Sequence, residues 1–122
     1  MKAIVLVFLG GGLGSVLRFL VGKYLNNYHS LPFGTFAANI LGSLFIGLIL
    51  GYALKTESLS QSSLLLLATG FCGGFTTFST FAYENHLFLR DGNLGLFLVY
   101  TIATFAVGLL AVFAGIWLVK LL

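Results

Sequence analysis

The segment that decides the fold covers residues 70–81 and reads Gly-Phe-Cys-Gly-Gly-Phe-Thr-Thr-Phe-Ser-Thr-Phe. It is uncharged, and two adjacent glycines are followed by four hydroxyl residues within five positions. Glycine pairs and β-branched threonines disfavour continuous helix, so we predict a break near residues 73–77. A glycine-rich helix crossing would explain the glycines, with the hydroxyls bonded to carbonyls four residues earlier. It would not explain so many hydroxyls in one run.

The rest of the chain has the composition of a membrane protein. Of its 122 residues, 59% are hydrophobic and 7% are charged, against about 25% charged in a typical soluble domain. Three uncharged stretches reach the roughly 20 residues that cross a bilayer, and the first span must continue past Arg18. We therefore predict a single all-α membrane domain over residues 1–122, with four transmembrane helices at 3–24, 33–54, 61–88 and 94–119. If the third span breaks inside the membrane, its freed carbonyls must face protein, water or an ion.

The cations give no preferred orientation. Four spans place Lys2, Lys55 and Lys120 on one side of the membrane. The other three cations, on the opposite side, are Arg18, Lys23 and Arg90. Either this tie is chance, or the chain inserts both ways up so that two copies pair antiparallel. The net charge of +3 does not indicate a nucleic-acid partner, because cations at span ends are explained by lipid headgroups.

Aromatic residues of the third span are spaced to share a face. Phe75, Phe78 and Phe81 recur every third residue, close to the hydroxyls of Ser79 and Thr80. The edge of a phenyl ring is positive, so ring edges and hydroxyls together favour an anion without supplying a charge. A phenylalanine stripe in a span is otherwise a packing feature, and both interpretations remain open from the spacing alone.

Two other spans also carry polar side chains. Asn39 offers two N–H donors in the second span, or joins helices there. Tyr100 and Thr104 are four residues apart in the fourth span and share a face, which is ambiguous alone. His29 and His86 lie near span ends without an acid at motif spacing, so we expect interfacial rather than catalytic histidines.

The segment 70–81 closely resembles the signature of the Fluc family of bacterial fluoride channels, also called CrcB proteins. Two further motifs resemble the same family: Gly10-Gly11-Gly12-Leu13-Gly14-Ser15 with Arg18, and Gly34-Thr35 with Asn39 and Gly42. The resemblance covers the whole chain in length, span number and motif order. It implies a fluoride-selective channel, not an enzyme, that passively exports fluoride across the bacterial cytoplasmic (inner) membrane and limits its toxicity.

The resemblance also implies an antiparallel, dual-topology homodimer whose two pores are each lined by both subunits. The backbone carbonyls of Gly73 and Thr76 from both subunits would hold a structural Na⁺. Arg18 would lie at the vestibule, and Glu84 near the end of the third span. The anion pathway would be lined by Asn39, Phe78, Ser79, Thr80, Phe81, Tyr100 and Thr104. The next position of the fourth-span polar track is Gly108, so the length of that track past Thr104 stays open.

Two other classes of protein have four short spans. A small dual-topology, proton-coupled exporter uses an embedded carboxylate in its first span. The acids here are Glu57, Glu84 and Asp91, and the first span has none. A structural membrane subunit without a transport role would need no broken third span.

Overall fold

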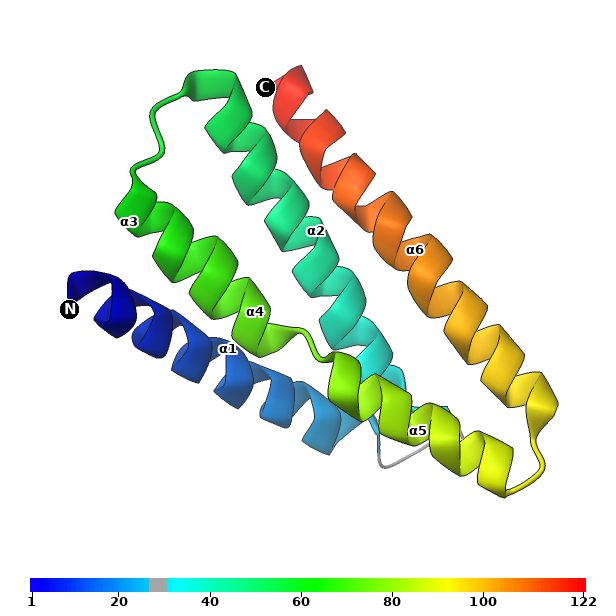
Figure 1. Cartoon of the computed structure of the whole chain (residues 1–122). Helices are drawn as coiled ribbons and strands as arrows, with labels where there is room; N and C mark the ends of the chain where they lie inside the picture. Colours follow the sequence, from blue (N-terminus) through cyan, green and yellow to red (C-terminus); the bar gives the residue numbers. More distant parts are fainter. Residues whose placement is uncertain (27–30) are drawn as a thin grey trace.

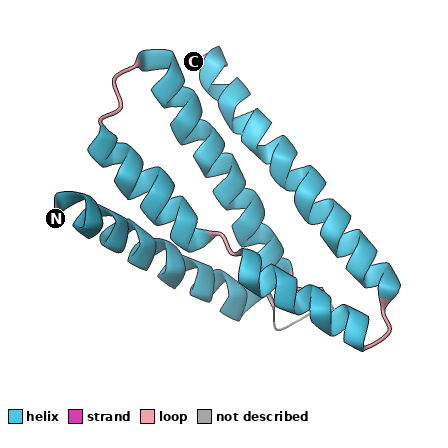
Figure 2. Cartoon of the chain, viewed as in Figure 1, coloured by secondary structure: helices cyan, strands magenta, loops and turns pink. Residues whose placement is uncertain are grey.

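The computed structural model describes residues 1–26 and 31–122, and every regular element within these ranges is helical (Figures 1 and 2). The predicted interfacial residue His29 lies outside the described ranges. The elements in chain order are α1 (Lys2–Leu25), α2 (Phe33–Thr56), α3 (Gln61–Leu64), the π-helical segment η1 (Leu65–Cys72), α4 (Gly73–Phe75), α5 (Phe78–Arg90) and α6 (Leu94–Leu121).

Four helical stretches are long and apolar enough to cross a membrane, as the composition predicted. They are α1, α2, the third span Gln61–Arg90 and α6, and their ends lie within two residues of the expected limits. Large apolar side chains cover their outer surfaces; Phe8 is 76% exposed and Trp117 is 60% exposed. In water such a surface would favour aggregation, whereas lipid tails solvate it. The chain is therefore a multi-pass membrane protein.

The spans pack as two close pairs. Figure 1 shows α1 beside the segment from α3 to α4, and α2 beside α6, with both termini at the end where α2 meets α3. Glycines allow these close approaches. A Cβ on Gly14 would collide with the backbone of Phe71 and Phe75, and one on Gly47 would collide with the backbone of Val112. Backbones this close gain van der Waals contact, which stabilises helix pairs in lipid.

The third span is interrupted at two threonines. Helix α4 ends at Phe75, and α5 begins at Phe78. Between them, Thr76 (φ −82°, ψ 158°) and Thr77 (φ −150°, ψ 121°) are extended, and a short loop separates the two helices in Figure 2. Gly73 is helical (φ −62°, ψ −38°), so the interruption is narrower than the expected 73–77. The glycine at 74 instead serves packing, because a Cβ there would collide with the backbone of Gly11.

Candidate functional site

Asn39 of α2 forms two hydrogen bonds to the interruption of the third span. Its Nδ2 donates to the Thr77 carbonyl at 3.1 Å, and its Oδ1 accepts from the Thr77 N–H at 2.8 Å. Backbone groups that leave a helix inside a membrane protein need other partners, because lipid offers none. One asparagine satisfies both groups of Thr77, and its second amide hydrogen is left over for another acceptor.

Thr77 is also the N-cap residue of α5. Its Oγ1 accepts from the N–H of Thr80 at 3.2 Å and donates to the Thr80 hydroxyl at 3.1 Å. The Ser79 hydroxyl lies 3.4 Å away, on the exposed surface of the helix. This is the N-cap arrangement that threonine favours. Three hydroxyls therefore gather at the first turn of α5.

The interruption leaves helical carbonyls without their usual donors. The partner of the Gly73 carbonyl would be the Thr77 N–H, but that group donates to Asn39. The partner of the Thr76 carbonyl would be the Thr80 N–H, but that group donates to the Thr77 side chain. The carbonyl of Gly74, in contrast, is occupied from α1.

Arg18 is the residue that occupies it. Its Nε donates to the Gly74 carbonyl at 3.0 Å, and the Ser15 hydroxyl lies 3.4 Å from the same oxygen. A cation at the carboxyl end of a helix is favourable, because unpaired carbonyls make that end negative. Arg18, expected at a vestibule, is thus bonded directly to the end of α4.

Two hollows meet at Thr77. The first, of about 460 Å³, lies between α2, α6 and the interruption. The expected pathway residues that line it are Asn39, Phe78, Phe81 and Thr104. The Thr104 hydroxyl oxygen is buried and has no hydrogen-bond partner among the described residues. The second hollow, of about 470 Å³, is lined by Thr80, Arg18 and further polar residues of α1 and α2.

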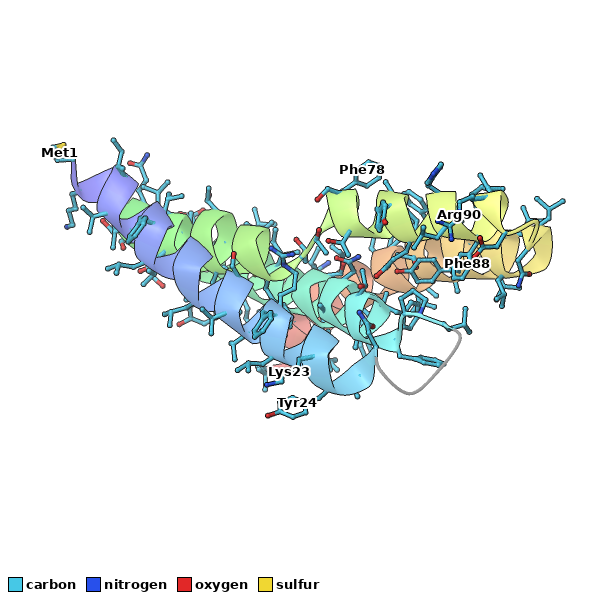
Figure 3. The ribbon with its side chains drawn as sticks, turned by 90° about the horizontal axis from the view of Figure 1, so that it is seen from below. Met1, Lys23, Tyr24, Phe78, Phe88 and Arg90 are labelled. Carbon is cyan, nitrogen blue, oxygen red and sulfur yellow. The ribbon has the colours of Figure 1, made fainter. Side chains whose placement is uncertain are left out.

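The two expected pore phenylalanines differ in exposure. Phe78 is 73% exposed, and Figure 3 shows its ring pointing away from the ribbon. Phe81 is 5% exposed and packs against Tyr100 (5.2 Å between ring centroids) and edge-on against Phe105 (5.8 Å). The rings of Phe78 and Phe81 lie 6.0 Å apart and are tilted, a favourable aromatic arrangement. Of these two rings, only that of Phe78 is therefore exposed on the surface of the chain.

Glu84 was expected near the end of the third span, but the hydrogen bonds that its carboxylate makes there were not predicted from the sequence. Glu84 accepts from the Thr35 hydroxyl at 2.6 Å and from the Tyr100 hydroxyl at 2.7 Å. The hydroxyl of Tyr100, an expected pathway residue, is thus bonded to Glu84, and Tyr100 is not among the residues that line the first hollow. The available signal was an acidic residue within an otherwise apolar span, which is a functional candidate in itself.

These features define the class: a small membrane protein of four helical spans, with an interrupted third span beside a hollow of amide, hydroxyl and aromatic groups. Residues 5–116 match the family described as CrcB-like protein, Camphor Resistance (CrcB), and the chain belongs to this family.

Three similar proteins are each named "Fluoride-specific ion channel FluC". The one from Gloeothece citriformis is 49% identical over 122 residues, which cover 98% of both chains. The one from Chlorobaculum tepidum is 48% identical and covers 99% of this chain and 97% of its own. The one from Leptospira interrogans (serovar copenhageni) is 41% identical and covers 98% and 95%, respectively.

Proposed function

We propose that this chain forms a fluoride-selective channel that exports fluoride passively across the bacterial cytoplasmic (inner) membrane and so limits fluoride toxicity. Its relatives carry the names of fluoride-specific ion channels and not of enzymes, over nearly the whole chain. The observation that carries the proposal is the first hollow. Amide, hydroxyl and aromatic groups line it, and none of the described residues that line it is charged.

Such a lining suits fluoride. This anion is small and holds its water tightly, so a pore must replace the hydration shell with hydrogen-bond donors. Uncharged donors and ring edges do this without trapping the anion as a fixed cation would. A pore whose donors close around so small an ion leaves little room for larger halides, which is the basis of the expected selectivity.

We infer that the anion pathway runs along the residues expected from the sequence, which are Asn39, Phe78, Ser79, Thr80, Phe81, Tyr100 and Thr104. The unpartnered hydroxyl of Thr104 supports this assignment, because a buried hydroxyl without a partner is costly unless a ligand or water satisfies it. Arg18 borders the second hollow, which suits a vestibule where an anion first meets positive charge.

On this proposal, a second copy in the opposite orientation completes each pore. The exposed ring of Phe78, the open space above Gly73 and the open first hollow support a covering partner. The even division of cations supports insertion in both orientations. The interruption at Thr76 and Thr77 falls near the middle of the third span, so we place it at the middle of the bilayer. Two antiparallel copies would then bring their interruptions together.

We further propose that the Gly73 and Thr76 carbonyls of both subunits hold a structural Na⁺. Both carbonyls lose their usual helical donors, and carbonyl oxygens are suitable sodium ligands, so the residues present fit the ion. When bound, Na⁺ supplies positive potential beside the anion pathways. Its role here is structural, since the transported ion is fluoride.

The proposal is tested by anion efflux from liposomes that contain the purified protein, followed with a fluoride electrode. We expect fast fluoride efflux, negligible chloride efflux and no dependence on a proton gradient. A passive pore behaves in this way because the passage of the ion is not coupled to the movement of a proton. Strict coupling of fluoride to protons would contradict the channel and favour the exporter, and the absence of any fluoride efflux would favour a structural subunit.

A further inference from the structure

Asn26, at the end of α1, is bonded to the start of α2. Its Oδ1 accepts from the N–H of Gly34 at 2.6 Å and from the N–H of Thr35 at 3.4 Å. Two N–H groups that point at one atom require that atom to be the amide oxygen. The amide nitrogen therefore faces the Thr35 side chain, 3.5 Å from Oγ1. The fit is close, because a Cβ on Gly34 would lie 2.7 Å from Asn26 Oδ1.

The Thr35 hydroxyl connects Asn26 to the Glu84 carboxylate. Thr35 is only 4% exposed, and its Oγ1 lies 2.6 Å from Glu84 Oε1. A hydroxyl has one proton to give, and a carboxylate can only accept, so the proton points at Glu84. The hydroxyl lone pairs are then left for the Asn26 amide. With Tyr100 donating to Oε2 at 2.7 Å, both carboxylate oxygens are held.

We propose that Asn26 is a positioning residue of the fluoride pathway, which directs the Thr35 proton to Glu84 and so fixes the carboxylate beside Tyr100. The inference rests on the proposed function, because Tyr100 is one of the expected pathway residues. Without the amide donor, the Thr35 hydroxyl is free to rotate toward another acceptor, as helix hydroxyls do. Glu84 then keeps one restraint instead of two, and a mobile negative charge beside the pathway slows the anion.

A double-mutant cycle separates this role from a merely structural one. Asn26→Ala removes the amide donor without adding charge. Thr35→Val removes the hydroxyl at nearly constant shape, and Thr35→Ser keeps it. We expect Asn26→Ala to slow fluoride efflux about fivefold when residue 35 is Thr or Ser. A rate change of this size corresponds to the free energy of one hydrogen bond. In the Thr35→Val background we expect less than a twofold effect, because the hydroxyl is already absent. Equal effects in all three backgrounds would overturn the proposal.

A matched control measures the general cost of losing an asparagine at a helix end. Asn93 caps the start of α6 through the N–H of Leu96 at 3.3 Å, and among the described residues it has no hydrogen bond to Thr35 or Glu84. Asn93→Ala should leave the rate of fluoride efflux within twofold of wild type. A fivefold loss there as well would assign the Asn26 effect to loop stability and overturn the positioning role.

An infrared measurement tests the hydrogen bond without transport. The carboxylate stretching band that disappears in Glu84→Gln belongs to Glu84. We expect Asn26→Ala to shift this band, and Thr35→Val to shift it as well. Adding Asn26→Ala to Thr35→Val should then cause no further shift. A band that Asn26→Ala leaves unmoved would overturn the proposal, even if Thr35→Val alone stops efflux. If the wild-type protein passed no fluoride but the band shifted as expected, the proposed function would fail and the positioning of Glu84 would stand.

Discussion

At the scale of single residues, Asn39 uses both ends of one amide on Thr77 of another span. From the sequence it was either a donor to an anion or a polar joint between helices. In the structure it joins two helices, and it also lines the same hollow as Phe78 and Thr104, with one amide hydrogen that the joint does not use. The two roles are therefore compatible in one side chain, because the amide has one more donor than the joint requires.

We predict that Asn39→Asp both loosens the interruption and slows fluoride. The substitution removes the donor to the Thr77 carbonyl and places a carboxylate oxygen against it. We expect the protein to lose about 1–3 kcal/mol in thermal unfolding in detergent, and fluoride efflux to fall sharply. Asn93→Asp is the control, since the α6 cap keeps its acceptor oxygen and should lose neither. Normal efflux from Asn39→Asp would remove Asn39 from the pathway.

The two pore phenylalanines should separate stability from conduction. Phe78→Ile replaces a ring that is 73% exposed, so the unfolding free energy should change by no more than about 0.5 kcal/mol, while fluoride efflux falls about tenfold. Phe81→Ile should lose efflux and also about 1 kcal/mol of stability, because Phe81 packs against Tyr100 and Phe105. Phe8→Ile is the matched control at 76% exposure on α1 and should change neither. Normal conduction by both pore variants would make these rings packing residues only.

At the scale of elements, the sequence predicted the helices well, because each span contains a long apolar run with few charges. The interruption was predicted near its observed place, but partly for the wrong reason. Glycine costs about 1 kcal/mol in a helix, yet the helix continues through Gly73 and Gly74. Close packing of Gly74 on Gly11 offsets that local cost. Tertiary contact, which a local pattern does not contain, decided where the helix stops.

The same limit explains why the hydrogen-bond partners of Glu84 were missed. Glu84 bonds to Thr35, 49 residues earlier, and to Tyr100, 16 residues later. Neither separation follows a helical period, so no motif spacing indicates the contact. The spacing of Phe75, Phe78 and Phe81 predicted one shared face, but the interruption lies between Phe75 and Phe78, and Phe78 is exposed while Phe75 and Phe81 are buried. The bonds of Arg18 to Gly74 and of Asn39 to Thr77 also join different spans, and the sequence indicated the residues but not their partners.

Adjacent glycines of α4 should respond differently to the same substitution. Gly74→Val should prevent folding, because a side chain there collides with the backbone of Gly11 in the same chain. Gly73 is in ordinary helical geometry and has open space, so the single chain should accept Gly73→Val. We expect this variant to insert but to lose the dimer and fluoride efflux, measured by cross-linking and by the electrode. Gly95→Val on α6 is the control for a valine in open helix. A normal, conducting Gly73→Val dimer would place the α4 face away from the interface.

At the scale of the whole molecule, the position of Arg18 alters the count of cations. Arg18 is bonded to the end of α4 within the bundle, so it contributes little to the charge outside the membrane. The remaining cations still divide almost evenly between the two sides, as three and two. Because the cations are so evenly divided, a few added charges should be enough to fix the orientation in which the chain inserts.

We predict that two lysines, one at Ser58 between α2 and α3 and one at Gln61, the first residue of α3, force a single orientation. They raise the cations on that side from three to five. If the working unit is antiparallel, this variant alone should give no fluoride efflux, although the protein is inserted. Co-expression with a copy that carries two lysines in the 91–93 turn should restore efflux, because the two forced orientations are opposite. Full activity from one forced orientation would contradict the antiparallel dimer.

The pair of hydrogen bonds between Asn39 and Thr77 also has a mechanical consequence. Asn39 donates one of these bonds and accepts the other, so together they brace the bend, or elbow, in the third span, which cannot straighten until both are broken. We expect a pore that passes beside this elbow to keep a rigid wall there for as long as both bonds hold. Fluoride that passes such a rigid wall is driven by its electrochemical gradient, which combines the concentration difference with the membrane potential.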